Sequence, residues 1–433
     1  MQILNTSSAP AAEVRARLSR TASLADAEKE ATVRAVIEDV RARGDAALLD
    51  YGRRWDYPGL ESLRVPQAEI DAAHAACDPE LLKTMRLAAA NIRAFHEKQL
   101  PNSWFDTSKP GVILGQHIQP VGTVGIYAPG GTAAYPSTLL MTAIPAMVAG
   151  VERIVLCSPP RDNGHVRPLL LAAAKECGVS DVFAVGGAQA IGAMAFGTET
   201  VPKVDVICGP GNIFVLLAKK LVVGTVNIES LPGPSEICVV ADGSANPSFV
   251  AADMLSQAEH GGLGASSTAV LITPSQALAD AVVKELAAQV ARQPRREILE
   301  QALDEGGLIV VARDVDEALD LANVMAPEHL ELEIADPWGH LSQVKNAGAI
   351  MIGPWSTEPV ADYWAGPSHV LPTGGTARFY GPLSVDVFLK KSSLVCYDEA
   401  RLREAAPHVV RFAEAEGLSA HANAVRVRLE GER

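Results

Sequence analysis

Short apolar segments alternate with Gly-containing turns and helices from residue 123 onward, and this alternation constrains the fold more than any other feature of the chain. The segments are four or five residues long and mostly apolar, as expected for strands that are covered on both faces. Strands of this kind that alternate with helices form parallel sheets. The first four strands are expected at Val124–Tyr127, Arg153–Cys157, Asp181–Val185 and Val204–Cys208.

The same alternation resumes after a break at Glu229–Asp242, which indicates a second α/β unit. A chain of 433 residues is too long for a single simple core. The fold class is therefore α/β, with two Rossmann-like domains built on parallel sheets. The expected helices of the second unit are Pro247–His260, Ala277–Ala291 and Val315–Met325, and its expected strands are Ala269–Thr273, Leu308–Ala312 and Ala349–Ile352.

The flanking regions lack this alternation. Residues up to about Ala22 are expected to form an irregular arm, and the portion from about Leu389 is expected to be helical and charged. A long charged helix is expected from about Asp26 to Tyr51, with further helices between Gln67 and His96. We therefore divide the chain into an N-terminal arm (1–22), a helical segment that joins the first α/β domain (23–121), a Rossmann-like domain (122–236), a completion of the first α/β domain (237–385) and a C-terminal tail domain (386–433).

Charge and cysteine content exclude several classes of protein. The net charge of -14 is spread along the chain without acidic or basic runs, which argues against nucleic acid and anionic membranes as partners. No apolar run approaches the roughly 20 residues that span a bilayer, and no apolar stretch follows Arg15 and Arg17, so we expect a cytoplasmic protein. The six cysteines form no CxxC pair, which argues against a thiolate zinc cluster and a disulfide framework. A soluble enzyme of small molecules fits these features best.

The end of the expected helix Pro247–His260 carries a candidate metal site. Gln257 and His260 lie three residues apart, so their side chains share one helix face and can converge on one atom. The Gly pair at 261 and 262 stops the helix, and the negative end of the helix dipole favours a cation there. The alternative is a polar last turn that meets only solvent.

Three Gly-containing turns follow strands of the first unit, at Tyr127–Gly131, Gly186–Gln189 and Gly209–Asn212. Such turns at one edge of a parallel sheet can form a crevice, which is where open α/β sheets bind ligands. The turn Gly209–Asn212 also opens a helix, where a dinucleotide pyrophosphate can rest on backbone N–H groups. Phe214, however, occupies the position of the third Gly in the GxGxxG fingerprint. The alternative is that the Gly residues merely permit tight turns.

Polar residues in the second unit complete the set of candidates. Glu328 and His329 follow a helix that ends at Pro327, and adjacent side chains in an extended segment point to opposite faces. The pair therefore suits two separate acid–base steps better than one hydrogen-bonded dyad; the alternative is a surface Glu and a packed His. Asp362, in the polar loop Asp362–His369, is either a hard oxygen ligand for zinc or a turn Asp bonded to nearby backbone.

Together these motifs resemble the histidinol dehydrogenase family over nearly the whole chain. The resemblance rests on eight segments in order and in register: YAPGG, GGAQAIGA, GPGN, GPSE, SQAEH, PEHL, ADYWAGPSHVLPTGGTARF and GLSAHANAV. It implies a zinc-dependent oxidation of L-histidinol to L-histidine through bound L-histidinaldehyde, the last steps of histidine biosynthesis. Two NAD+ and one water would be consumed, and the domain at 122–236 would bind the NAD.

The resemblance also implies a role for individual residues. His329 would take the alcohol proton in the first oxidation, and Glu328 would activate water for the second. The implied zinc ligands are Gln257, His260, Asp362 and His421. The implied substrate contacts are Ser235, Gln257, His260, His329, Asp362, His369, Glu416 and His421. The implied cofactor contacts are Tyr127, Gln189 and Asn212.

Members of the family are homodimers in which the C-terminal segment crosses to the partner, so the resemblance implies that Glu416 and His421 complete the site of the other subunit. Many members have Asn at the position of Ser368 and Gly at the position of Ala361, which bears on the fit of the substrate. Manganese or cobalt also suits the implied N/O ligand set.

Two alternatives remain open. The first is a related zinc and NAD dehydrogenase of another small amino or sulfonated alcohol, which would differ around Ser235, His369 and Glu416. The second is an inactive binding protein, which should have lost Glu328, His329 or a zinc ligand, and none of these is missing from the chain.

Overall fold

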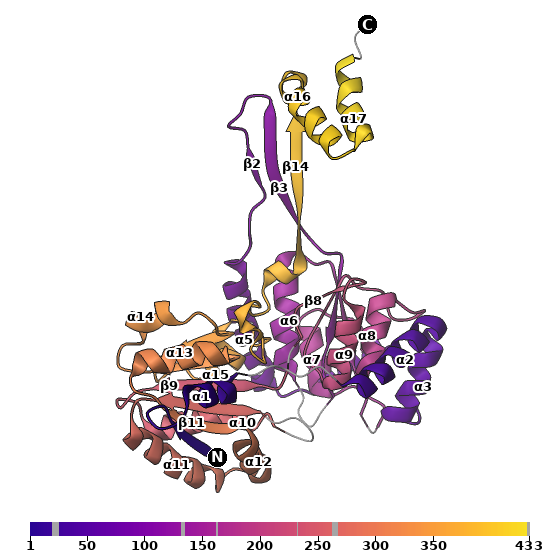
Figure 1. The fold of residues 1–433 in the computed structure, drawn as a ribbon. Coiled ribbons are helices and arrows are strands. Elements are labelled where there is room, and N and C mark those ends of the chain that lie inside the picture. Colours follow the sequence, from indigo (N-terminus) through magenta and orange to yellow (C-terminus); the bar gives the residue numbers. More distant parts are fainter. Residues whose placement is uncertain (20–25, 131–134, 162, 232, 262–266, 431–433) are drawn as a thin grey trace. The chain divides into compact units, whose positions relative to one another are not determined.

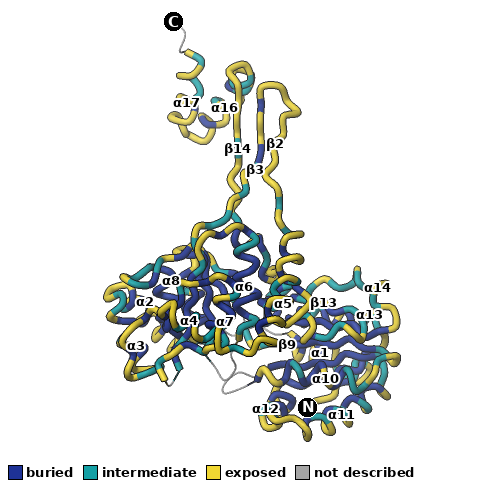
Figure 2. The backbone as a smooth tube through the Cα atoms, turned by 180° about the vertical axis from the view of Figure 1, so that it is seen from behind, coloured by how far each residue is buried: buried dark blue, intermediate teal, exposed yellow. Residues whose placement is uncertain are grey.

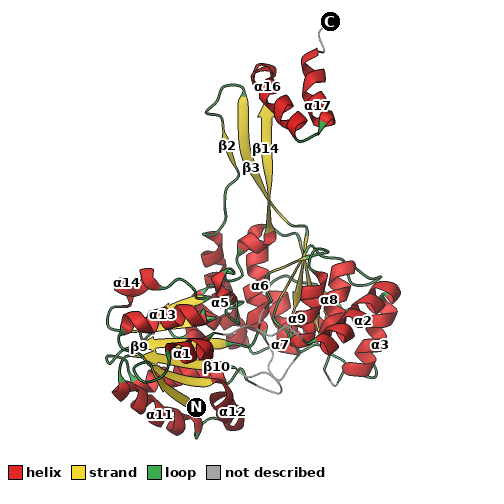
Figure 3. Cartoon of the chain, viewed as in Figure 1, coloured by secondary structure: helices red, strands yellow, loops and turns green. Residues whose placement is uncertain are grey.

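The computed structural model describes residues 1–19, 26–130, 135–161, 163–231, 233–261 and 267–430. They form two compact units: the first combines Met1–Gln99 with Val121–Phe388, and the second combines Leu100–Pro120 with Leu389–Arg433. The first unit holds two parallel sheets with helices packed on them, which confirms the predicted α/β fold class (Figures 1 and 3). None of the helices within the described ranges is long and apolar enough to cross a membrane.

The five-stranded sheet of the first unit has the order β6-β5-β4-β7-β8, with every pair parallel. Its strands are β4 (Thr123–Tyr127), β5 (Arg153–Ser158), β6 (Asp181–Ala184), β7 (Val206–Cys208) and β8 (Asn227–Ile228). The four predicted strands are confirmed, and the two-residue β8 was not predicted. The helices that follow these strands are α6 (Pro136–Ala149), α7 (Pro168–Glu176), α8 (Gly187–Phe196) and α9 (Ile213–Val222).

The six-stranded sheet has the order β1-β11-β10-β9-β12-β13 and is also parallel throughout. Its strands are β1 (Gln2–Asn5), β9 (Glu236–Ala241), β10 (Thr268–Thr273), β11 (Gly307–Val311), β12 (His329–Glu333) and β13 (Ala349–Ile352). One apolar cluster packs it against α10 (Pro247–Ala258), α11 (Gln276–Val290) and α12 (Arg296–Gly306). A second cluster packs it against α1 (Ala11–Leu18) and α13 (Val315–Met325). Figure 2 shows the buried residues concentrated in these layers.

Three segments that belong to this sheet or pack on it differ from the prediction. The break expected at Glu229–Asp242 contains β9, because six consecutive residues from Glu236 to Ala241 are buried between neighbouring strands. The arm expected to be irregular contains β1 and α1. Strand β1 pairs in parallel with β11, with Ile3 opposite Ile309. That pairing joins residues about 300 positions apart, so it leaves no local signal in the sequence.

The long charged helix expected from Asp26 to Tyr51 is two helices, α2 (Ala27–Arg43) and α3 (Asp45–Trp55). Gly44 separates them with a φ of 55°, in the region that favours glycine. Two further helices, α4 (Gln67–Ala75) and α5 (Pro79–Glu97), confirm the helices expected between Gln67 and His96. The remaining short elements of the first unit are α14 (Pro337–His340), η1 (Leu341–Gln343), α15 (Glu358–Val360), the π-helical η2 (Ala361–Ala365), η3 (Thr376–Arg378) and η4 (Val385–Phe388).

The second unit is a small antiparallel sheet with two helices. Its strands, in the order β14-β3-β2, are β14 (Leu389–Tyr397), β3 (Val112–Pro120) and β2 (Trp104–Asp106), and its helices are α16 (Glu399–Ala415) and α17 (Ser419–Glu430). The prediction of helix directly from Leu389 is wrong, because Leu389 to Tyr397 pair residue by residue with β3. Most of this unit is exposed (Figure 2).

Candidate active site

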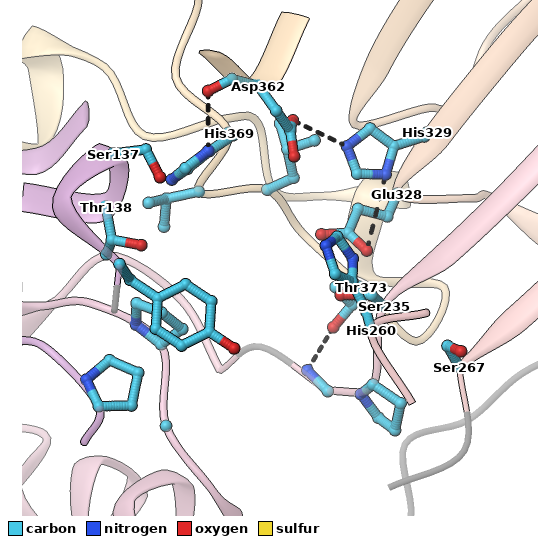
Figure 4. A pocket seen from close by; sticks show the side chains of 18 of the residues that line it. Ser137, Thr138, Ser235, His260, Ser267, Glu328, His329, Asp362, His369 and Thr373 are labelled. Atoms are coloured by element: carbon cyan, nitrogen blue, oxygen red, sulfur yellow. Dashed lines mark hydrogen bonds and ion pairs between the residues drawn. The ribbon is translucent and has the colours of Figure 1, made fainter. Parts of the chain in front are cut away.

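A pocket of about 340 Å³ lies in the first unit, lined by residues from both of its α/β halves. On one side lie Ser137 and Thr138 of α6 (Figure 4). Pro210 and Gly211, in the turn that follows β7, also line the pocket. On the other side lie residues that precede or begin strands of the six-stranded sheet, and segments that follow its helices. The carboxyl edge of one sheet thus meets the amino edge of the other. Six of the predicted site residues line this pocket: Ser235, His260, Glu328, His329, Asp362 and His369.

His329 begins β12 and is 3% exposed. Its Nδ1 lies 2.9 Å from Gln257 Oε1 and 3.3 Å from the backbone oxygen of Glu236. Both neighbours are acceptors, so Nδ1 carries a hydrogen, and Nε2 has its lone pair when the imidazole is neutral. Nε2 has no hydrogen-bond partner among the described residues and lies 3.6 Å from Asp362 Oδ1. The contacts of Nδ1 therefore orient the ring, which presents Nε2 toward Asp362.

Gln257 and His260 come together as the sequence predicted, although α10 ends at Ala258, two residues before the expected end. Gln257 is fully buried, and its Nε2 donates to His260 Nδ1 at 3.0 Å. One amide thus bridges the imidazoles of His260 and His329. Gly262, which the sequence analysis used to end the helix, lies outside the described residues.

Asp362 lies in the π-helical turn η2 and is 9% exposed. Its Oδ1 has no hydrogen-bond partner within the described part of the chain. Burial would raise the pKa of this carboxyl, but the imidazoles of His329, His369 and His260 lower it below its ordinary value. An ionised, unpartnered carboxylate oxygen beside imidazoles is the donor set that a divalent cation such as zinc accepts.

Glu358 is a residue of this site that the sequence analysis missed. Ligand atoms of His329, Glu358 and Asp362 lie within 4.8 Å of one another, and Glu358 Oε2 accepts a hydrogen bond from the Ser256 hydroxyl at 2.9 Å. Burial raises the pKa of Glu358 to about 7. The available signal was its position four residues before Asp362, a spacing that puts two side chains on one face of a helical turn.

Glu328 and His329 line the same pocket, so the expectation that they point to opposite faces is wrong. Glu328 precedes β12 and is not held in its pleat. Glu328 Oε2 accepts the backbone N–H of Glu236 at 2.9 Å and lies 3.8 Å from His329 Nδ1. The latter distance is too long for a hydrogen bond, in agreement with the prediction that the two residues form no hydrogen-bonded dyad.

The Glu328 carboxyl and the His329 imidazole both hold their protons more tightly than they would in water. Burial raises the pKa of Glu328 to about 8. Burial alone would lower the pKa of His329, but the carboxylates of Glu328, Asp362 and Glu358 outweigh it and raise that pKa to about 10. A carboxyl and an imidazole that exchange protons at or above neutral pH are suited to acid–base chemistry.

The remaining pocket residues have simpler surroundings. Ser235 precedes β9, and its backbone oxygen accepts the N–H of Thr268 at 3.0 Å. His369 Nδ1 lies 3.1 Å from the backbone oxygen of Asp362, and burial lowers the pKa of His369. A neutral imidazole at this position is held by the same turn that presents the Asp362 carboxylate.

The three predicted cofactor contacts sit on the turns of the five-stranded sheet. The Tyr127 hydroxyl accepts the N–H of Gly187 at 3.1 Å, which ties the first of these turns to the second. Asn212 caps α9 by accepting the N–H groups of two residues at its start. Gln189 is 2% exposed. The pocket lining includes Pro210 and Gly211 of the third turn, but not Tyr127, Gln189 or Asn212 themselves. Gly131 lies outside the described residues.

Glu416 and His421 belong to the second unit and are exposed. Glu416 caps the end of α16, and His421 lies in the first turn of α17. The site in the first unit therefore contains three of the four predicted metal ligands, Gln257, His260 and Asp362.

Comparisons with known proteins agree on one family. A family model described as histidinol dehydrogenase matches residues 19–429. The histidinol dehydrogenase of Moorella thermoacetica is 54% identical over 402 residues, which cover 92% of this chain and 94% of that protein. That of Heliobacterium mobile is 51% identical over 94% of this chain and 95% of its own length. The crystal structure of histidinol dehydrogenase from Elizabethkingia anophelis superposes with a TM-score of 0.93 at 37% identity, covering 100% of this chain and 98% of that one.

Proposed function

This chain belongs to the histidinol dehydrogenase family, which makes it an oxidoreductase of histidine biosynthesis, and we propose that it carries out the complete NAD-dependent oxidation of L-histidinol to L-histidine. Two NAD+ and one water are consumed, and L-histidinaldehyde stays bound between the two hydride transfers. The observation that carries this proposal is the buried pair of His329 Nε2 and Asp362 Oδ1, each without a hydrogen-bond partner in the described residues, beside the pocket.

Zinc fits the donor atoms of this site. The Asp362 carboxylate is buried, ionised and unpartnered at Oδ1, and His260 and Gln257 supply a neutral imidazole and an amide nearby. These residues, with His421, would hold the ion. When bound, zinc would supply a charged centre that binds substrate nitrogens and aims the carbinol carbon.

His329 is the proposed base of the first oxidation. The alcohol loses a hydride to NAD+ and a proton to His329 Nε2, the nitrogen left free by the contacts of Nδ1 with Gln257 and Glu236. The carboxylates around His329 raise its pKa to about 10. A divalent cation beside Asp362 would offset one of those charges and lower the pKa toward the range in which His329 accepts a proton.

Glu328 is the proposed base of the second oxidation. The aldehyde adds water to form a gem-diol, which then loses a second hydride and a proton to give the carboxylic acid. Glu328 keeps one oxygen fixed by the N–H of Glu236 and lines the pocket, so the carboxyl has a defined orientation toward a bound water. Its pKa of about 8 lies close to neutral pH, which suits general acid–base catalysis.

The second unit supports a shared site in a homodimer. Several of its large apolar side chains are exposed, among them Trp104, Phe105, Val395 and Phe412, with Phe412 at 70%. Exposed apolar surface of this kind marks an interaction site. We propose that Glu416 and His421 complete the active site of the partner subunit. Mixing His421→Ala with His329→Ala subunits should then restore activity in mixed dimers, and no activity at all would exclude shared sites.

The stoichiometry of NADH formation tests the reaction. After zinc loading, a limiting amount of L-histidinol should give two equivalents of NADH. One equivalent would indicate a simple alcohol dehydrogenase, and none would indicate a binding protein. The same assay with other small amino alcohols separates histidinol oxidation from the activity of a related dehydrogenase.

A further inference from the structure

A buried ion pair lies behind one of the turns that line the pocket. Lys219 of α9 places its Nζ 2.7 Å from both carboxylate oxygens of Glu229, the residue that follows β8. The two side chains are 1% and 2% exposed. A buried pair of this kind stabilises a fold little more than apolar side chains of similar volume would. Its presence therefore calls for a role other than stability.

Both members of the pair bind the backbone of Gly209. Lys219 Nζ donates to the Gly209 carbonyl oxygen at 3.2 Å, and Glu229 Oε1 accepts the Gly209 N–H at 2.8 Å. Gly209 has a φ of 113°, and a Cβ there would lie 2.0 Å from the backbone oxygen of Tyr127. The peptide groups on both sides of this residue are thus fixed by charged partners while it lies against the end of β4.

The fixed residue begins the turn that reaches the pocket. Pro210 and Gly211 line the pocket, and Asn212 closes the turn by capping α9 through its side chain. The turn is therefore held at one end by the Lys219–Glu229 pair and at the other by the Asn212 cap. Gly233, Pro234 and Ser235, which follow Glu229 in the sequence, also line the pocket.

We propose that Lys219 and Glu229 are positioning residues for NAD, which hold the Gly209–Asn212 turn in the conformation that receives the dinucleotide. This inference rests on the proposed use of NAD. The pair carries no net charge, so its effect is local geometry and not long-range attraction of the cofactor. Replacing both residues by apolar ones changes neither the net charge nor the volume much, but it deprives Gly209 of both partners.

The double variant Lys219→Met/Glu229→Leu tests the inference. It leaves no unpaired buried charge and should fold. We expect the KM for NAD to rise by about tenfold or more, because two buried peptide groups lose their hydrogen bonds and the turn relaxes. The KM for L-histidinol should stay within about twofold, and the Kd of NADH from a fluorescence titration should rise with the KM for NAD.

Two further variants separate positioning from stability. Lys219→Met/Glu229→Gln also leaves no unpaired buried charge, and it keeps an oxygen that accepts the Gly209 N–H. Its KM for NAD should therefore rise less than that of the Met/Leu variant, by about threefold. It also tests the inference if the Met/Leu variant fails to fold. Leu171 is a buried residue of α7, which follows β5, whereas the turn follows β7. Leu171→Ala opens a cavity there and lowers stability without removing a partner of Gly209. Its KM for NAD should equal that of the wild type.

Two results would overturn the positioning role. The first is a folded variant that lacks the pair but has an unchanged KM for NAD. The second is a rise in the KM values for both NAD and L-histidinol that Leu171→Ala reproduces at an equal loss of stability. If the Met/Leu variant does not fold, an unchanged KM for NAD in Lys219→Met/Glu229→Gln counts equally as the first result. If the wild-type protein forms no NADH with L-histidinol, the proposed function is wrong and this inference is wrong with it. If the wild-type protein does oxidise L-histidinol with NAD, either overturning result contradicts only the positioning role and leaves the proposed function intact.

Discussion

Three carboxyl groups lie buried together next to the candidate site, and one of them allows a direct test of the electrostatic reasoning. Asp253 of α10 and Glu331 and Glu333 of β12 bring carboxylate oxygens within 4.8 Å of one another. Glu331 is 2% exposed, and its Oε1 accepts the backbone N–H of Glu358 at 2.9 Å. Its Oε2 has no hydrogen-bond partner among the described residues. Burial and the neighbouring carboxylates raise the pKa of Glu331 to about 9.

The raised pKa fixes the sign and size of a pH effect on stability. Glu331 keeps its proton in the folded chain up to about pH 9, whereas in the unfolded chain it ionises above its ordinary value of 4.5. The stability that the protonated group contributes is complete below that value and is lost as pH rises toward 9. Between about pH 5.5 and pH 8.5 the loss is at most about 4 kcal/mol, at ~1.4 kcal/mol per unit. Because the three carboxyls share protons, we expect roughly half of this, about 2 kcal/mol.

Glu331→Gln removes this loss because an amide does not ionise. Its oxygen still accepts the N–H of Glu358, and its NH2 group donates to the neighbouring carboxylates. The free energy of unfolding of the variant, relative to the wild type, should therefore rise by about 2 kcal/mol between about pH 5.5 and pH 8.5. Urea titrations followed by tryptophan fluorescence at the two pH values measure it. The exposed Glu297→Gln of α12 is the control and should show no such difference. A variant whose relative stability is the same at both pH values would refute the reasoning.

Three further predictions concern the site itself. Asp362→Ala removes the carboxylate whose Oδ1 has no partner among the described residues. The zinc retained after dialysis, measured by atomic absorption, should therefore fall below one tenth of the wild-type content. Zinc retained at the wild-type level would contradict the ligand assignment. Glu328→Gln keeps an acceptor for the N–H of Glu236 but loses the base of the second oxidation. Single-turnover assays should therefore show at most one equivalent of NADH per L-histidinol. Two equivalents at the wild-type rate would exclude the proposed role of Glu328 as that base. Gly209→Ala should lower the unfolding free energy by about 1–3 kcal/mol or more, because its Cβ would strike the Tyr127 carbonyl; an unchanged melting temperature would contradict that geometry.

Elements with a strong local pattern were predictable, and those that depend on remote partners were not. Helix Val315–Met325 and strand Ala349–Ile352 have the bounds expected, because each alternates cleanly with its neighbours and ends at turn residues. Strand β9 follows Gly and Pro, which are typical of turns, and only its neighbours β10 and β12 make it a central strand. The strand at Leu389–Tyr397 carries Lys and Ser among its apolar residues, and its strand conformation follows from pairing with β3.

In the candidate active site too, contacts that depend on local spacing were predictable, and contacts between remote segments were not. The spacing of Gln257 and His260 on one helix predicted that they converge, and they do. The sequence did not predict that the Gln257 amide also orients His329, because that contact joins α10 to β12 across 72 residues. Glu358 was missed because its spacing of four residues from Asp362 does not by itself distinguish a buried carboxylate from an exposed one, and only burial beside Asp362 identifies it.

The pairing of α10 with β12 explains how one helix serves both the site and the carboxyl cluster. His329 and Glu331 lie two residues apart on one face of the strand, which advances by about 6.6 Å. Their partners Gln257 and Asp253 lie four residues apart on the helix, which advances by about 6.0 Å. Because the two spacings nearly match, a helix that places an amide against His329 also places a carboxylate against Glu331. The apolar residue between them, Leu330, faces the opposite side of the sheet. The polar residues of this strand, which resemble a solvent-exposed face in the sequence, are therefore covered by the helix that carries Gln257, one of the proposed metal ligands.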